Sequence, residues 1–353
     1  MLWVTAVLFS LVSALFRRFE TAIGLYSFMV LGYLVGTPNY TYNGDAIVYA
    51  ADYMHKANMF ESGYNWICSV AGNYINYSTF RLYSSLIVYF LLFVIIRIFT
   101  NRVTMISLFS SIAIFPFDNE QVRNGMLSLF VLFCAYLLVK WNKAGIVPAL
   151  LVIYCGSLFH SLGLLFMFLP VVWMFRNNIE KHFKLYFSIL SIISVIIEIV
   201  GPYRLSSLLS VFVARFSSRS DIGENVSAVY NNGTFYIWLV FYLVTIVMLI
   251  SFYGFKNDLK SYSPKYYQLF LCAMILWGGG LILLTLSVDY LRILRLVGYF
   301  YFILIASLIP KVRFKKGMWL FVFGNTSAIL LFLSQMTVYG LNWTQIESIF
   351  HLI

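Results

Sequence analysis

Long apolar runs recur along nearly the whole chain and constrain its fold more than any other feature. A bilayer core requires about 20 apolar residues per helix, and with 61% hydrophobic residues in 353 the chain exceeds what a soluble domain could bury. We therefore predict an all-α polytopic integral membrane protein, a single transmembrane domain over residues 1–353 with about 12 membrane helices. The runs lie near residues 1–16, 21–36, 80–99, 103–117, 121–139, 145–158, 161–175, 184–200, 235–254, 266–287, 295–310 and 317–334.

The basic residues are distributed unevenly among the polar segments, and this predicts the orientation of the chain. A net charge of +11 could suggest a nucleic-acid partner, but the positive-inside rule accounts for most of it. With the N-terminus outside, 16 of the 24 basic residues lie in cytoplasmic loops. We therefore predict no nucleic-acid partner. The eight outer basic residues, seven of them arginine, are Lys56, Arg81, Arg123, Arg204, Arg215, Arg219, Arg292 and Arg295.

Two long segments, residues 37–79 and 201–234, are predicted to be outer loops. Both are rich in Tyr, Asn, Ser and Gly, and the first has helical spacing around Tyr49 and Tyr53. We expect this first loop to form a folded surface with interfacial helices.

Residues 145–175 do not fit a simple crossing pattern. At about 1.5 Å per residue they span about 46 Å, short of two full crossings at about 30 Å each. We expect two short or broken helices that turn at the sequence SLFHSLG. This turn would place His160 at or just below the outer surface.

The stretch FDNEQVRNGM, residues 117–126, puts three charges between two apolar runs. Asp118 could cap the next helix, with Gln121 three residues on as in a capping box, and acids such as Glu120 suit a first helical turn. Capping leaves Arg123 unexplained, because an arginine one turn inside a membrane helix requires water, a partner or an anion. A metal site built on Asp118 and Glu120 alone lacks further ligands, and the four cysteines show no metal-binding spacing.

The sequence SVDYLRILRLVGYFYF, residues 287–302, places two arginines on one helical face. Arg292 and Arg295 are three residues apart, and Tyr299 follows four residues later. Snorkelling to the interface explains one arginine, whereas two on one face, with Asp289 nearby, favour a phosphate clamp. Arg81 and Arg215 could add to the same basic site or be ordinary solvated charges.

Several motifs resemble, in order, those of the EpsG/Wzy family of bacterial polysaccharide polymerases. They cover some 270 residues, and three positions depart from the family pattern: the early acid has no counterpart except nearby Asp45, Ser62 replaces a proline, and Asn124 replaces a glutamine. The motifs are VGTPNYTY (35–42), FESGY (60–64), VRNGML (122–127), FHSLGLL (159–165) and RLVGYF (295–300).

The resemblance implies a polymerase on the outer face of the bacterial inner membrane, with a GT-C-like general plan. Such enzymes join oligosaccharide repeat units carried on undecaprenyl pyrophosphate, which is both donor and acceptor, in O-antigen, capsule or exopolysaccharide synthesis. They require membrane lipid but no cofactor or metal, and a chain-length regulator protein is a further partner that the resemblance allows.

Roles for individual residues follow from this expectation. Arginines at helix ends would hold the pyrophosphate and stabilise its charge as it leaves, and a base would take a proton from the acceptor hydroxyl. The expected pyrophosphate ligands are Arg123, Arg292, Arg295, Arg81 and Arg215. The candidate bases are, in order, His160, Glu61, Asp118 and Asp45, with Tyr299, Glu120 and Asp289 in supporting positions.

Two other functions remain open from the sequence. A lipid-linked oligosaccharide flippase or other transporter has a similar helix number, but transporters place polar residues near the midplane of the bilayer. An O-antigen ligase or another transferase using the same lipid carrier would present similar outer loops.

Overall fold

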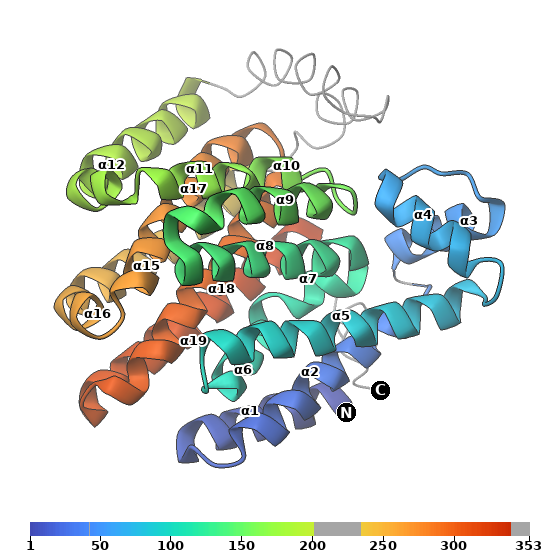
Figure 1. The fold of residues 1–353 in the computed structure, drawn as a ribbon, viewed down its shortest axis with the longest axis horizontal. Coiled ribbons are helices and arrows are strands. Elements are labelled where there is room, and N and C mark those ends of the chain that lie inside the picture. The colour runs from blue at the N-terminus through green and yellow to red at the C-terminus, as the bar shows by residue number, and fades with distance from the viewer. Residues whose placement is uncertain (42, 201–233, 340–353) are drawn as a thin grey trace.

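The computed structural model describes residues 1–41, 43–200 and 234–339, and within these ranges every regular element is helical, as the apolar runs predict. Figure 1 shows their arrangement. The α-helices are α1 (Leu2–Phe16), α2 (Glu20–Gly36), α3 (Gly44–His55), α4 (Ser62–Ala71), α5 (Tyr77–Phe99), α6 (Val103–Ala113), α7 (Phe115–Glu120), α8 (Val122–Trp141), α9 (Ile146–Ser157), α10 (Gly163–Phe166), α11 (Phe168–Met174), α12 (Arg176–Val200), α15 (Thr234–Gly254), α16 (Lys256–Tyr262), α17 (Pro264–Leu286), α18 (Leu291–Leu308) and α19 (Phe314–Tyr339). Three 3-10 helices, η1 (Asn142–Gly145), η2 (Val288–Tyr290) and η3 (Ile309–Lys311), connect them.

Seven helical segments in the described ranges are long and apolar enough to cross a membrane, which makes the chain a multi-pass membrane protein. Shorter apolar helices pack among them, so the predicted number of about 12 crossings and the GT-C-like plan stay predictions. The seven segments are Tyr77–Phe99, Val122–Ser157, Arg176–Val200, Phe235–Gly254, Pro264–Leu286, Val288–Lys311 and Phe314–Ser334, and the shorter helices are Leu2–Phe16, Glu20–Gly36, Val103–Ala113 and Gly163–Met174.

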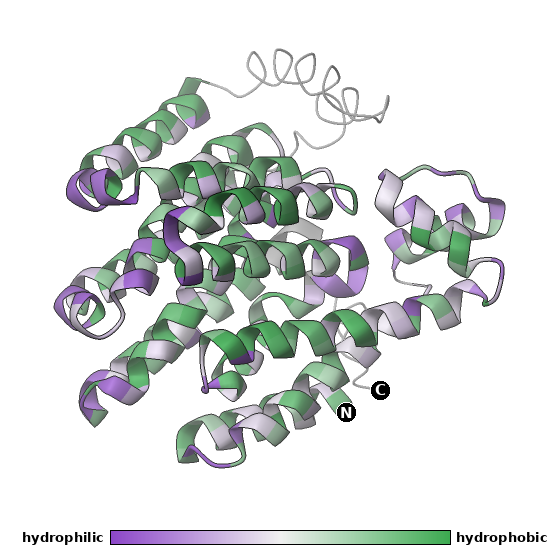
Figure 2. Cartoon of the chain, in the orientation of Figure 1, coloured by the Kyte–Doolittle hydropathy of each residue, from purple (hydrophilic) through white to green (hydrophobic). Residues whose placement is uncertain are grey.

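Polar residues gather at the two ends of the helix bundle, with apolar helices between them (Figure 2). One end carries the α1–α2 and α8–α9 turns and α16, whose sequences contain many of the basic residues predicted to be cytoplasmic; we call it the basic end. The opposite end carries α3, α4 and α7, and we call it the α3 end (Figure 1). The first predicted outer loop is folded, as expected, since α3 and α4 lie within it.

The segment 145–175 forms two short helical legs, as predicted. Helix α9 packs on α8 and ends at Ser157, and α10 and α11 then return along α9. The turn between the legs, residues 158–162, reaches the α3 end beside α4 (Figure 1). His160 therefore lies at the end where the polar outer segments gather.

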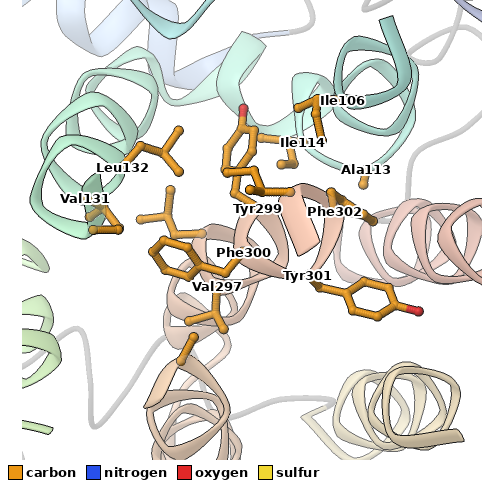
Figure 3. Close-up of a cluster of buried hydrophobic side chains, with 14 of the residues drawn as sticks. Ile106, Ala113, Ile114, Val131, Leu132, Val297, Tyr299, Phe300, Tyr301 and Phe302 are labelled. Carbon is orange, nitrogen blue, oxygen red and sulfur yellow. The ribbon is translucent and has the colours of Figure 1, made fainter. Parts of the chain in front are cut away.

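Helix α18 is the centre of the bundle. In an apolar 18-residue stretch of Val288–Lys311, 94% of the residues are buried, compared with 17% in the corresponding stretch of Arg176–Val200, so α12 lies at the periphery. In Figure 3, Phe302 of α18 lies beside α6, and Phe300 lies toward Val131 of α8. Charged residues near the start of α18 are consequently held by packing on several sides.

The close contact of α2 with α5 begins the construction of the polar end. A Cβ on Gly36 would lie 2.7 Å from Leu82 Cα and 3.0 Å from its side chain, so only glycine fits this crossing. The absent side chain brings the end of α2 onto α5 next to Arg81. Arg81 Nε can therefore donate to the Val35 carbonyl oxygen at 2.9 Å.

Candidate functional site

Arg123, the second residue of α8, is enclosed by residues of the first predicted outer loop. Its guanidinium forms an ion pair with Glu61, and its Nε donates to the Tyr49 hydroxyl at 3.0 Å. The Phe60 ring centroid lies 4.2 Å from Arg123 Cζ, a cation–π contact. Arg123 and Glu61 are both buried, each 6% exposed. Because a buried charge without a partner is very costly, Glu61 fixes Arg123 and is fixed by it.

The second oxygen of Glu61 joins the α4 start to the turn between α9 and α10. Glu61 Oε1 accepts from the Ser161 backbone N–H at 2.8 Å, and the Leu158 carbonyl oxygen accepts from Gly63 N–H, also at 2.8 Å. A Cβ on Gly63 would lie 2.8 Å from that same carbonyl oxygen, so the contact requires glycine. Three segments that are distant in the sequence are thereby tied into one unit.

His160 lies on this tied turn. It is 5% exposed, and its Nδ1 accepts from the Leu162 backbone N–H at 3.2 Å. That nitrogen therefore carries no proton in this arrangement. His160 is held beneath the surface, next to Ser161, whose backbone N–H donates to Glu61.

Asp118 forms the second buried ion pair of the α3 end. It lies inside α7, where it accepts from the Tyr89 hydroxyl at 3.3 Å and lies 3.6 Å from Arg295; Asp118 and Arg295 are each 1% exposed. The expectation that Asp118 caps α8 is wrong, because the residue at that cap is Gln121, without a side-chain capping bond. Asp118 forms an ion pair with Arg295, and the partner of Arg123 is Glu61.

Tyr299 follows Arg295 by one helical turn, on the face that the spacing predicts. Its ring is buried between α18 and α6, and its hydroxyl points away from α18 (Figure 3). Tyr299 therefore packs beside the Asp118–Arg295 pair rather than at the surface.

Arg81 is fully engaged with the protein. Besides Val35, it donates to the Tyr77 hydroxyl at 3.4 Å and to the Asn119 carbonyl oxygen at 2.6 Å, and it is 1% exposed. The same Asn119 oxygen accepts from Asn43 Nδ2 at 2.9 Å. The carbonyl before Glu120 is thus fixed from α5 and from the start of α3 at once.

Three charged groups lie nearer the surface above these buried pairs. Arg292 pairs with Asp289 at 2.7 Å, and its side chain is 20% exposed. Asp45 in the first turn of α3 is accessible to solvent, and Glu120 at the end of α7 is partly exposed. These three belong to different elements, which the Asn43–Asn119 bond and the packing of α7 bring to one end.

The charges of this end act on one another. Partial desolvation by the surrounding protein raises the pKa of Asp45 although the side chain is accessible, and Arg292, Arg123 and Arg81 oppose that rise. Burial and the nearby Asp45 carboxylate raise the pKa of Glu120 to about 7, against the pull of Arg295 and Arg292. Each of the four arginines therefore acts on at least one of these two carboxyls.

The structure thus brings together most of the predicted site residues at the α3 end, and Arg215 lies outside the described residues. Sequence reasoning missed Asn43, Asn119, Tyr89 and Phe60 as members of the site. Asn43 had a local signal, since an Asn before a helical run is a common N-cap, and it does cap α3. No local sequence signal indicated Tyr89, because its partner Asp118 lies on another helix.

The arrangement is suited to binding an anion next to a proton acceptor. Guanidinium groups match phosphate oxygens, and the most exposed of the four, Arg292, stands among carboxyls that could accept a proton. In the described ranges, no group of three or more His, Cys, Asp or Glu residues is placed to hold a metal ion.

The fold and site define a multi-pass membrane protein with a mixed arginine–carboxylate site at one end of its bundle. The family model of the EpsG family matches residues 21–347, nearly the whole chain, and the chain belongs to that family. It is thus a polysaccharide-polymerase-type membrane protein, as the sequence motifs predict. Neither a curated protein nor a solved structure matches the chain.

Proposed function

We propose that the protein polymerises oligosaccharide repeat units linked to undecaprenyl pyrophosphate, on the outer face of the bacterial inner membrane. The observation that supports this most is that Arg81, Arg123, Arg292 and Arg295 each act electrostatically on Asp45 or Glu120 at one end of a chain of the EpsG family. A diphosphate on a polyprenyl tail is an anion held at a membrane boundary, and this end of the bundle offers it cationic partners there.

In this proposal the arginines divide into one that contacts the substrate and three that support the site. Arg292 binds the pyrophosphate, because its side chain is exposed beyond those of the others. Arg123 and Arg295 are buried beneath Arg292 and contribute positive potential at the site. Arg81 holds α7 in position through its bond to the Asn119 carbonyl oxygen. As the glycosidic bond to the carrier breaks, the leaving pyrophosphate gains charge that the positive field stabilises.

The test is to replace Arg292 by Ala in the native host and to separate the surface glycan on a gel. We expect single repeat units capped on the acceptor in place of the ladder. The matched control is Arg313→Ala, an exposed arginine at the basic end, which should leave the ladder intact.

Other outcomes of the same gel point to other functions. Polymer retained on its lipid carrier with no surface glycan would indicate an O-antigen ligase or a related transferase. Units stalled on the inner face would indicate a flippase. An unchanged ladder for Arg292→Ala, with the protein still inserted in the membrane, contradicts the proposed site.

A further inference from the structure

The candidate bases at the α3 end differ in how far an acceptor sugar can reach them. Asp118 is 1% exposed, His160 5% and Glu61 6%. Asp118 and Glu61 also have their oxygens engaged, Asp118 with Tyr89 and Arg295, and Glu61 with Arg123 and Ser161. A general base must come within hydrogen-bond reach of the proton that it takes, so these three groups suit support of the site better than proton transfer.

Asp45, Glu120 and Asp289 are accessible carboxyls of this end; Asp289 pairs with Arg292, and one contact positions the other two. Glu120 directly follows Asn119, whose carbonyl oxygen accepts from Asn43 at 2.9 Å and from Arg81 at 2.6 Å. Asp45 is two residues after Asn43, in the first turn of α3. The same short contact therefore positions both carboxyls, one from each element.

The charged groups that act on Asp45 and Glu120 belong to α5, α8, η2 and α18. Glu120 lies in the electrostatic field of Asp45 of α3 and of Arg295 and Arg292 of α18. Asp45 in turn lies in the field of Arg123 of α8, Arg81 of α5 and Asp289 of η2. Neighbouring carboxylates resist double ionisation, and the arginines favour the ionised form of each.

We propose that Glu120, with Asp45 as its partner, is the catalytic base that deprotonates the acceptor hydroxyl. This inference rests on the proposed function. It moves Glu120 from a supporting position to the reacting atoms, and it makes Glu61, Asp118 and His160 positioning residues.

The Glu120 carboxylate takes the proton of the acceptor hydroxyl, whose oxygen forms the new bond to the anomeric carbon of the donor. The bond from that carbon to the pyrophosphate oxygen breaks, and the leaving pyrophosphate keeps the electron pair. Glu120 then releases its proton to water. Asp45 raises the proton affinity of Glu120, which suits a base that works near neutral pH.

The test uses the full chain in lipid nanodiscs, with lipid-linked repeat units extracted from native-host membranes that lack this gene. The rate of formation of the first inter-unit bond is measured under single-turnover conditions, from about pH 5.5 to about pH 8.5. We expect the wild-type rate to rise with pH through about 7. Glu120→Gln should lower the rate about 100-fold or more and flatten this dependence, without weakening binding of the donor.

A second pair of variants separates a catalytic role from a structural one. Glu120→Asp should recover part of the lost rate. Asp45→Asn should shift the pH profile to lower pH, because removing the neighbouring negative charge lowers the pKa of Glu120. The matched control Glu180→Gln, at the basic end where Glu180 pairs with Lys260, should retain the wild-type rate and profile.

The outcomes distinguish the two proposals. If folded Glu120→Gln protein extends the units at the wild-type rate with an unchanged pH profile, the assignment of the base is wrong and the polymerase function stands. If the wild-type protein forms no inter-unit bond, and deleting the gene leaves the surface glycan ladder unchanged, the polymerase function itself is wrong.

Discussion

Among the described residues, the α3 end buries two of its three ion pairs and the basic end buries one of three. At the α3 end, Arg295 and Asp118 are each 1% exposed, whereas at the basic end Lys316 and Asp258 are 50% and 22% exposed. Exposed pairs contribute little to stability, while buried pairs carry a large desolvation cost. The buried charges of the α3 end therefore cost stability that an apolar core would not. Strongly perturbed charges of this kind tend to gather at functional sites.

One buried pair at the basic end shows what a purely structural solution looks like. Arg102 and Glu20 lie 2.8 Å apart, and Glu20 also accepts from the backbone N–H of Thr104 at 3.2 Å. This pair ties the start of α2 to the start of α6. The α3 end differs because accessible groups, Arg292, Asp45 and Glu120, lie above its buried pairs.

The largest expected effect in this comparison comes from breaking a buried pair at the α3 end. Arg123→Ala leaves the Glu61 carboxylate buried without its cation, which should destabilise the protein by about 3–5 kcal/mol. The measurement is the unfolding temperature in detergent, followed by the fraction of protein that stays monodisperse after heating. Changing both partners, Arg123→Met with Glu61→Leu, should restore much of the loss, and a double variant as unstable as the single one would contradict a charge-based cost.

A smaller effect should follow from disturbing the backbone contact that ties α4 to the α9–α10 turn. The added Cβ of Gly63→Ala would lie 2.8 Å from the Leu158 carbonyl oxygen, and overpacking of this kind costs about 1–3 kcal/mol. Gly279→Ala is the matched control, because nothing lies within 4 Å of its added Cβ. Equal unfolding temperatures for the two variants would show that the α3 end is not held by this contact.

The pH dependence of stability should isolate the contribution of Glu120. Its pKa is raised from 4.5 to about 7, so the folded state binds its proton more tightly than the unfolded state does. Stability from this group is therefore present at low pH and is lost as pH rises from about 4.5 to about 7. Across that window the unfolding temperature of the wild type should fall relative to Glu120→Gln, and parallel curves for the two proteins would exclude the raised pKa.

Local sequence patterns predicted much of the fold because apolar runs and residue spacing are local quantities. They located the helices, the turn at His160 and the shared face of Arg295 and Tyr299. The break that creates α7 also had a signal, since Pro116 suits the first turn of a new helix.

The pairings within the site could not be predicted in the same way. Glu61 and Arg123 are 62 positions apart in the sequence, and Asp118 meets Arg295 only because α7 packs near α18. Periodicity gives the face of one helix but not the helix that covers it. The capping interpretation of Asp118 failed for this reason, since it considered only the neighbours of Asp118 in the sequence.

The smallest expected loss of stability comes from breaking an exposed ion pair at the basic end. Lys316→Ala removes the exposed partner of Asp258, and because both groups remain solvated the cost should be about 0–1 kcal/mol. The same heating assay measures it, and added salt should reduce the difference further, because salt screens exposed charges more than buried ones. A loss as large as that of Arg123→Ala would mean that burial does not separate the two ends, and the argument that the α3 end retains its charges for function would lose its basis.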